Sequence, residues 1–111
     1  MSHTIATKFY SLLMQIENKH NFDWADGLHR KILKAVMDAH LNNIRLNNNH
    51  IVDLNLTSRS STYRKIADLK QFGFLSETWD NMICYLTLGP AAIEMLADTD
   101  NKLKALNEKP D

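Results

Sequence analysis

The stretch of residues 57–75 constrains the fold most, because it has the start, the end and the periodicity of a single helix. Either Thr57 or Ser58 can cap the N-terminus, since a hydroxyl at this position accepts a hydrogen bond from a backbone N–H of the first turn. Gly73 stands where a helix commonly ends in a left-handed residue. Positions that recur at i, i+4 and i+7 predict one buried face: Thr62, Ile66 and Leu69.

The opposite face of this predicted helix is polar over its first two turns. It carries short hydroxyls, a phenol and two guanidiniums: Arg59, Ser60, Ser61, Tyr63 and Arg64. Such side chains bury little apolar area but can hydrogen-bond phosphates and base edges. Residues 57–73 contain four Lys or Arg and one Asp, so this segment alone has a net charge of +3 (4 − 1). A face that is merely solvated is the alternative interpretation of the pattern.

Two amphipathic helices are predicted before this segment, over residues 4–19 and from Asp23 or Asp26 to about residue 42. The apolar seam of the first is Ile5, Phe9, Leu12, Leu13 and Ile16. The inner face of the second is Leu28, Ile32, Ala35, Val36 and Ala39, with His29, Arg30, Lys31 and Lys34 on or near the outer face. Residues 44–46 form a single strand-like rung, and an asparagine at 47–49 caps a short helix.

A hairpin is predicted after Gly73, with strands at residues 74–78 and 82–88. The turn between them is Trp79, Asp80 and Asn81. Thr87 then caps a final helix, in whose first turn Pro90 needs no N–H partner. The apolar seam of that helix is Ile93, Leu96, Leu103 and Leu106, and polar residues at 98–102 bend or break it.

Composition excludes several classes of protein. A chain of 111 residues with 44% apolar residues suits one domain with one core. The single cysteine, Cys84, excludes an intrachain disulfide and a cysteine-based zinc site, and its apolar surroundings predict a buried residue rather than a nucleophile. No pair of the five histidines has i, i+4 spacing, so neither a metal site nor a cofactor is predicted. We expect no enzyme, no membrane span and a cytoplasmic location.

The residues also carry a family resemblance. The run from Ser60 to Leu75, ending in Gly73-Phe74-Leu75 and followed by Leu86-Thr87-x-Gly89, resembles the MarR family of bacterial transcriptional regulators. The resemblance covers about half of the chain well, from Ile44 to Leu96. It implies a winged helix-turn-helix, mainly α with a small β-hairpin. The implied parts are an N-terminal helix in residues 1–22, a winged core in 23–88 and a C-terminal helix in 89–111.

The resemblance implies a homodimer, formed through the N- and C-terminal helices, that binds double-stranded DNA at a roughly palindromic site. Carried over by position, the residues that face the major groove are Ser60, Ser61, Tyr63 and Arg64. The residues expected to contact phosphates are Arg59, Lys65 and Lys70. Because the chain is shorter than a typical member, small-molecule sensing is not carried over, and the effector is unknown.

The predicted wing departs from the family pattern. Family wings usually carry Asp-x-Arg, whereas here Trp79, Asp80 and Asn81 are followed by Met82, with no arginine two residues after the Asp. Trp79 can fold back on the sheet, contact DNA or meet a protein partner. Together with the zero net charge, this departure supports the alternative of a winged-helix protein–protein interaction module without DNA binding.

Overall fold

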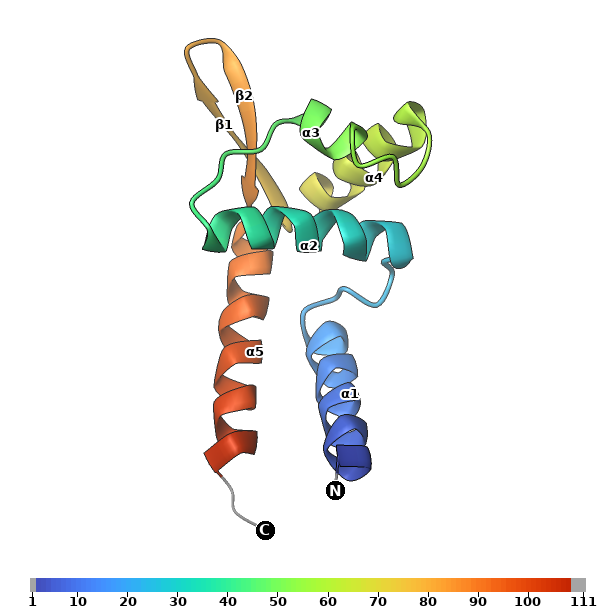
Figure 1. Cartoon of the computed structure of the whole chain (residues 1–111), viewed down its shortest axis with the longest axis vertical. Helices are drawn as coiled ribbons and strands as arrows, with labels where there is room; N and C mark the ends of the chain where they lie inside the picture. The colour runs from blue at the N-terminus through green and yellow to red at the C-terminus, as the bar shows by residue number, and fades with distance from the viewer. Residues whose placement is uncertain (1, 109–111) are drawn as a thin grey trace. The chain divides into compact units, whose positions relative to one another are not determined.

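The computed structural model describes the backbone of residues 2–108 and the side chains of residue 8 and residues 11–105. The elements across these residues are α1 (Ser2–Lys19), α2 (Gly27–Leu41), α3 (Asn48–Val52), α4 (Arg59–Gln71), β1 (Leu75–Asp80), β2 (Ile83–Leu88) and α5 (Pro90–Glu108) (Figure 1). The prediction of a mainly helical chain with one small antiparallel hairpin is confirmed. None of the described helices combines the length and the apolar character that crossing a membrane requires.

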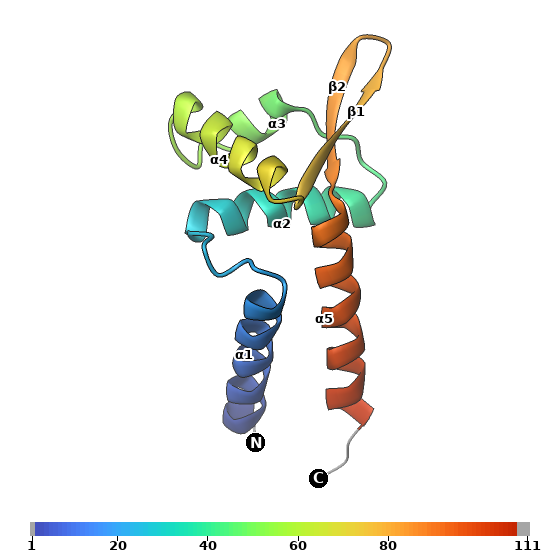
Figure 2. The same cartoon turned by 180° about the vertical axis from the view of Figure 1, so that it is seen from behind.

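The backbone forms two compact units. One unit comprises residues 25–92, and the other comprises the chain up to Trp24 together with the chain from Ile93 onward. Within the first unit, the pair α3–α4 and the hairpin lie on the same side of α2, and the views from front and back agree on this (Figures 1 and 2).

The core of the 25–92 unit receives side chains from each of its elements. Thr62, Ile66 and Leu69 of α4 are buried, which confirms the face predicted from their spacing. The hairpin contributes two buried leucines from β2 and one from β1. The larger apolar side chains that fill this core are Ile32, Leu33, Val36, Ile51, Ile66, Leu69, Phe74, Leu75, Leu86 and Leu88.

Local capping decides where the three helices of this unit begin. Asp26, and not Asp23, is the N-cap of α2, Asn47 caps α3, and Ser58, and not Thr57, caps α4. Both Asp26 and Asn47 take part in capping boxes, in which the residue three positions after the cap is a histidine, His29 or His50. In each box the imidazole Nδ1 accepts the backbone N–H of the cap residue, at 3.0 Å. Each box thus satisfies donors that the helix itself leaves open.

The turn of the hairpin is shorter and lies later than predicted. Trp79 and Asp80 belong to β1, where they pair with Cys84 and Ile83, so of the predicted turn at residues 79–81 only Asn81 lies in the turn. The turn is Asn81-Met82, and both residues have positive φ, 49° and 67°. A two-residue turn of this kind matches the twist of the strands, and Asn adopts positive φ readily. Its second position is held by a methionine, which gave the sequence no turn signal.

Two predictions about the C-terminal helix are also wrong. Thr87 does not cap it, because Thr87 pairs with Ser76 inside β2 and the chain stays paired until the Gly89 N–H donates to the Phe74 carbonyl, at 2.9 Å. Nor is the helix broken at residues 98–102, since α5 runs unbroken from Pro90. The strand-like rung at residues 44–46 is confirmed by the bridge between Leu46 and Leu86.

Asp98 joins the two helical parts of the second unit. The side chains of Lys19 and His20, at the end of α1, donate to its carboxylate at 3.1 and 3.0 Å. These hydrogen bonds, that of His20 first, hold the pKa of Asp98 below its ordinary value. The chain near them buries Ile16, Phe22 and Met95. The side chains of Ile5, Phe9 and Leu106, which were predicted for the apolar seams, lie outside the described residues, as do residues 109–111.

Two glycine-to-alanine changes should have opposite effects on stability. A Cβ on Gly89 would stand 2.2 Å from the carbonyl oxygen of Gly73, whereas a Cβ on Gly27 would meet nothing within 4 Å. Gly89→Ala should therefore lower the free energy of unfolding by about 1–3 kcal/mol. Gly27→Ala should raise it by roughly 0.4–1 kcal/mol, since it only restricts the unfolded chain. Urea denaturation measures both, and an unchanged midpoint for Gly89→Ala would contradict the close approach.

Candidate nucleic-acid interface

The N-terminal half of α4 presents the polar face that its sequence predicts. Arg59, Ser60, Tyr63 and Arg64 are exposed, and Ser61 is half-buried. Arg59 lies across this surface, since its guanidinium carbon is 5.8 Å from the centre of the Tyr63 ring. One guanidinium nitrogen of Arg59 also donates to the Asn49 side chain of α3, at 3.2 Å. The Asn49 amide thus orients the Arg59 side chain without neutralising its charge, which can still attract an anionic ligand.

Arg64 is the other exposed cation of this face. Among the described residues, Arg64 has no hydrogen-bond or ion-pair partner. An arginine without a partner offers the full fork of guanidinium donors, which matches phosphate and guanine acceptors.

The two lysines predicted to contact phosphates each have a carboxylate partner within the protein. Lys65 pairs with Asp26 of the α2 cap, and Lys70 pairs with Glu77 of β1. The hydrogen bond from Lys65 lowers the pKa of Asp26 far below its ordinary value, and the one from Lys70 lowers the pKa of Glu77. The net charge of +3 counted along the helix therefore overstates the positive charge that α4 presents to a ligand.

The prediction that His29 lies on or near the outer face of α2 is wrong, because its side chain is buried and only 5% exposed. Its Nδ1 accepts the Asp26 backbone N–H, so the hydrogen of a neutral ring lies on Nε2, which donates to Asp68 of α4 at 2.9 Å. The N-terminal end of α2 therefore holds α4 at two points, through Lys65 and through Asp68. The Asp-x-x-His spacing of a capping box was the sequence signal for the first of His29's contacts, but nothing local indicated the second.

On the hairpin, the predicted site residues have different surroundings. The Trp79 side chain is 65% exposed. Asp80 accepts a hydrogen bond from Arg45 at 2.6 Å, and Arg45 also lies over the Tyr85 ring, with its guanidinium carbon 4.9 Å from the ring centre. This pairing raises the pKa of Arg45. Asn81 lies in the turn beside Met82, which is 94% exposed.

Arg45 is a functional candidate that sequence reasoning missed. It precedes the residue that bridges to β2, and this rung brings it beside the hairpin. The sequence predicted this strand-like rung, but it did not indicate that Arg45 would pair with Asp80, which lies 35 residues later.

Cysteine and metal-ligand residues are the remaining candidates for a chemical site. Cys84, predicted to be buried, is half-buried, and burial raises the pKa of its thiol. In the part of the chain that the structure describes, no three His, Cys, Asp or Glu side chains are grouped to hold a metal ion.

Comparison with solved structures places this arrangement in a known fold. No protein-family model and no curated protein sequence matches the chain. A mutant of TubR, a protein of type III plasmid segregation, superposes with a TM-score of 0.61 and 16% identity, over 80% of this chain and 93% of that chain. HlyU from Vibrio cholerae superposes with a TM-score of 0.53 and 14% identity, over 88% and 94%.

The chain has the winged helix-turn-helix fold. In this fold α3 and α4 form the helix-turn-helix, α4 has the position of the helix that is named the recognition helix, and the hairpin β1–β2 is the wing. The exposed surface made by Arg59, Ser60, Ser61, Tyr63 and Arg64, called the recognition face below, therefore lies on the element that enters a DNA groove in proteins of this motif.

The link between Asp26 and the recognition helix predicts a pH-dependent stability. Asp26→Ala removes both the cap and the Lys65 partner, and should cost about 0.5–2 kcal/mol near pH 7. Asp26→Asn is the matched variant, because Asn caps helices about as well but lacks the charge. It should cost less than Asp26→Ala.

The sign of the pH effect follows from the lowered pKa of Asp26. A carboxylate with a lowered pKa stabilises the fold above its unfolded value and loses that contribution as the pH falls. The difference in unfolding free energy between the natural protein and Asp26→Asn should therefore narrow below about pH 4. Urea denaturation at about pH 7 and about pH 3 tests this, and a difference that stays constant would rule out the ionic contribution.

Proposed function

We propose that this protein is a sequence-specific DNA-binding transcriptional regulator of the MarR type, which acts as a homodimer in the cytoplasm. The observation that carries the proposal is the recognition face, which presents two arginines on a helix whose opposite side is buried and fixed to α2. Two recognition helices of a dimer would enter successive major grooves and control access of polymerase to a promoter.

Each side chain of the recognition face has a distinct proposed role. Arg64 contacts a base, because a guanidinium pairs bidentately with guanine. Ser60, Ser61 and Tyr63 contact base edges or adjacent phosphates, and Arg59, held by Asn49, contacts a phosphate. Lys65 and Lys70 add to the salt-dependent part of the affinity, but less than free lysines would, because each already has a carboxylate partner.

The wing fits beside DNA without an arginine. Its two carboxylates, Glu77 and Asp80, are each paired with a cation, Lys70 and Arg45, so the wing does not present unpaired negative charge at these positions. We propose that Asn81 and the adjoining Asp80 and Trp79 lie near the DNA backbone, where the wing contributes shape rather than charge.

The unit that contains α1 supports the homodimer. Two large apolar side chains of its described residues are exposed, Met14 on α1 at 53% and Ile93 on α5 at 50%. Burial against a second copy would remove this apolar surface from water.

A protein-interaction module is the alternative function, and the wing is the feature that favours it. Trp79, Met82 and Ile83 expose apolar surface there, with exposed fractions of 65%, 94% and 45%. Plasmid segregation, the process named for TubR, is a further possibility and would use the same recognition helix. Finding where the bound sites lie in a genome would separate it from control of transcription.

The DNA-binding proposal predicts a specific loss for one variant. On a site selected from random duplexes, Arg64→Ala should cost roughly 1–3 kcal/mol of affinity, and less on unrelated DNA. Lys34→Ala, which removes an exposed cation of α2 away from the recognition face, is the matched control and should change little. Fluorescence anisotropy at two salt concentrations measures both.

Two other outcomes would change the assignment. Equal loss on all sequences would make Arg64 a phosphate contact. No binding of any duplex at low salt would overturn the DNA-binding proposal, and a partner whose binding is lost in Trp79→Ala would then favour the interaction module.

The dimer proposal has its own test. Met14→Glu combined with Ile93→Glu should convert the dimer to a monomer, because two charges would be buried without partners. Gln15→Glu adds a charge at an exposed position of α1 and should leave the dimer intact. Sedimentation equilibrium gives the mass, and a natural protein that sediments as a monomer at micromolar concentration would contradict the proposal.

A further inference from the structure

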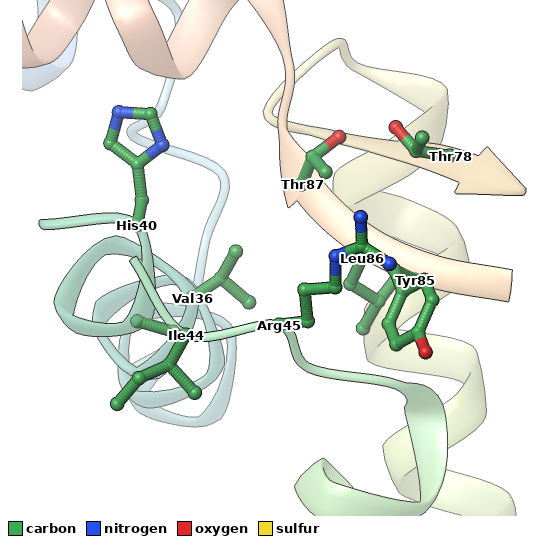
Figure 3. Close-up of a pocket in the computed structure, with 9 residues that line it drawn as sticks. Val36, His40, Ile44, Arg45, Thr78, Tyr85, Leu86 and Thr87 are labelled. Carbon is green, nitrogen blue, oxygen red and sulfur yellow. The ribbon is translucent and has the colours of Figure 1, made fainter. Parts of the chain in front are cut away.

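A small hollow lies between the C-terminal end of α2, the segment that follows it, and the wing (Figure 3). Its volume is about 130 Å³. Its aliphatic lining comes from Val36, Ala39, Ile44 and Leu86. Its polar lining includes the guanidinium of Arg45 and the hydroxyls of Thr78 and Thr87 on the side of the wing, and the imidazole of His40 on the side of α2.

The guanidinium of Arg45 is held in place by contacts that leave some of its N–H donors without an acceptor. Its guanidinium carbon lies over the Tyr85 ring, and one of its amino groups donates to Asp80. A guanidinium has five N–H donors, so this bond leaves donors for a second acceptor. The side chain is 64% exposed and so can be approached from solvent.

The register of the wing makes Thr78 and Thr87 diagonal neighbours on one face of the hairpin. Thr78 pairs with Tyr85, and Thr87 pairs with Ser76, so Thr78, Tyr85 and Thr87 share one face of the sheet. No hydrogen bond is recorded for either hydroxyl within the described residues. Each can therefore donate to a bound oxygen.

We infer that this hollow is a binding site for a short aliphatic carboxylate. The planar fork of Arg45 matches the two oxygens of a carboxylate. The hydroxyls of Thr78 and Thr87 donate to the same group, while the aliphatic tail packs against Val36 and Ile44. A cavity of about 150 Å³ holds a molecule the size of benzene, so a ligand of roughly six heavy atoms fits this one.

The ligand would compete with a group of the protein itself. Asp80 accepts from one amino group of Arg45 and is the last residue of β1, next to the turn of the wing. A carboxylate bound to both arms of the guanidinium needs that amino group as well. A bound carboxylate would draw Arg45 away from Asp80 and release the tie between the wing and the segment that precedes α3. A ligand in the hollow would thus change how the wing is held.

Titration of the full chain followed by NMR tests the site without DNA, so its result is independent of the DNA-binding proposal. The probes are isobutyrate, its neutral isostere isobutyramide, and inorganic phosphate. We expect isobutyrate to shift the Arg45 Nε–H and the backbone amides of Thr78 and Thr87 saturably, and isobutyramide to cause no saturable shift. Saturation by phosphate but not by isobutyrate would overturn the proposal, because it would assign the site to an inorganic anion.

Two variants and a control sharpen the test. Asp80→Asn removes the competitor, so isobutyrate should bind about two- to fivefold more tightly, which corresponds to the usual strength of an exposed ion pair. Arg45→Gln should abolish binding, and Asp53→Asn, which removes an exposed carboxylate outside the hollow, should leave the affinity unchanged. Circular dichroism confirms that each variant is folded. Unchanged or weaker binding by Asp80→Asn, or binding that persists in Arg45→Gln, would overturn the proposal.

Discussion

The packing of α4 against α2 is the interaction on which the rest of the structure depends. Thr62, Ile66 and Leu69 bury one side of the recognition helix, and Thr62 keeps its hydroxyl satisfied by donating to the Ser58 carbonyl at 2.9 Å. At the edge of this apolar contact, Asp26 and His29 add polar ties that a helix rotated about its axis could not make. Because one side of α4 is fixed in position and rotation, the side that carries Arg59 and Arg64 is fixed as well.

The distribution of charge follows from the chemistry of the two basic residue types. The lysines of α4 reach carboxylates at its edges, because their four-carbon stems are long and flexible. The arginines of α4 stay on the exposed face, where a planar fork with several donors can recognise an external group. A chain with no net charge can therefore still present a locally basic surface.

The features that could be predicted from the sequence are those that depend on neighbours a few residues apart. Periodicity located α4 and its buried face, and hydroxyl or amide residues located its cap and that of α3. Two features that the sequence did not indicate depend on contacts over long separations: His29 donates a hydrogen bond to Asp68, 39 residues later, and Arg45 joins the wing through Asp80. The turn was misplaced because a methionine with positive φ has no characteristic sequence signal.

The close approach of Gly73 and Gly89 has a mechanical consequence. The Gly73 carbonyl accepts the Ala91 N–H at 3.0 Å, and the Phe74 carbonyl accepts the Gly89 N–H at 2.9 Å. The end of α4, both ends of the wing strands and the first turn of α5 therefore meet with no slack chain between them. A displacement of the start of α5 is therefore transmitted to the end of α4 through these two backbone hydrogen bonds. A ligand that contacts residues 90–92, the first turn of α5, can thus act on α4 without touching it.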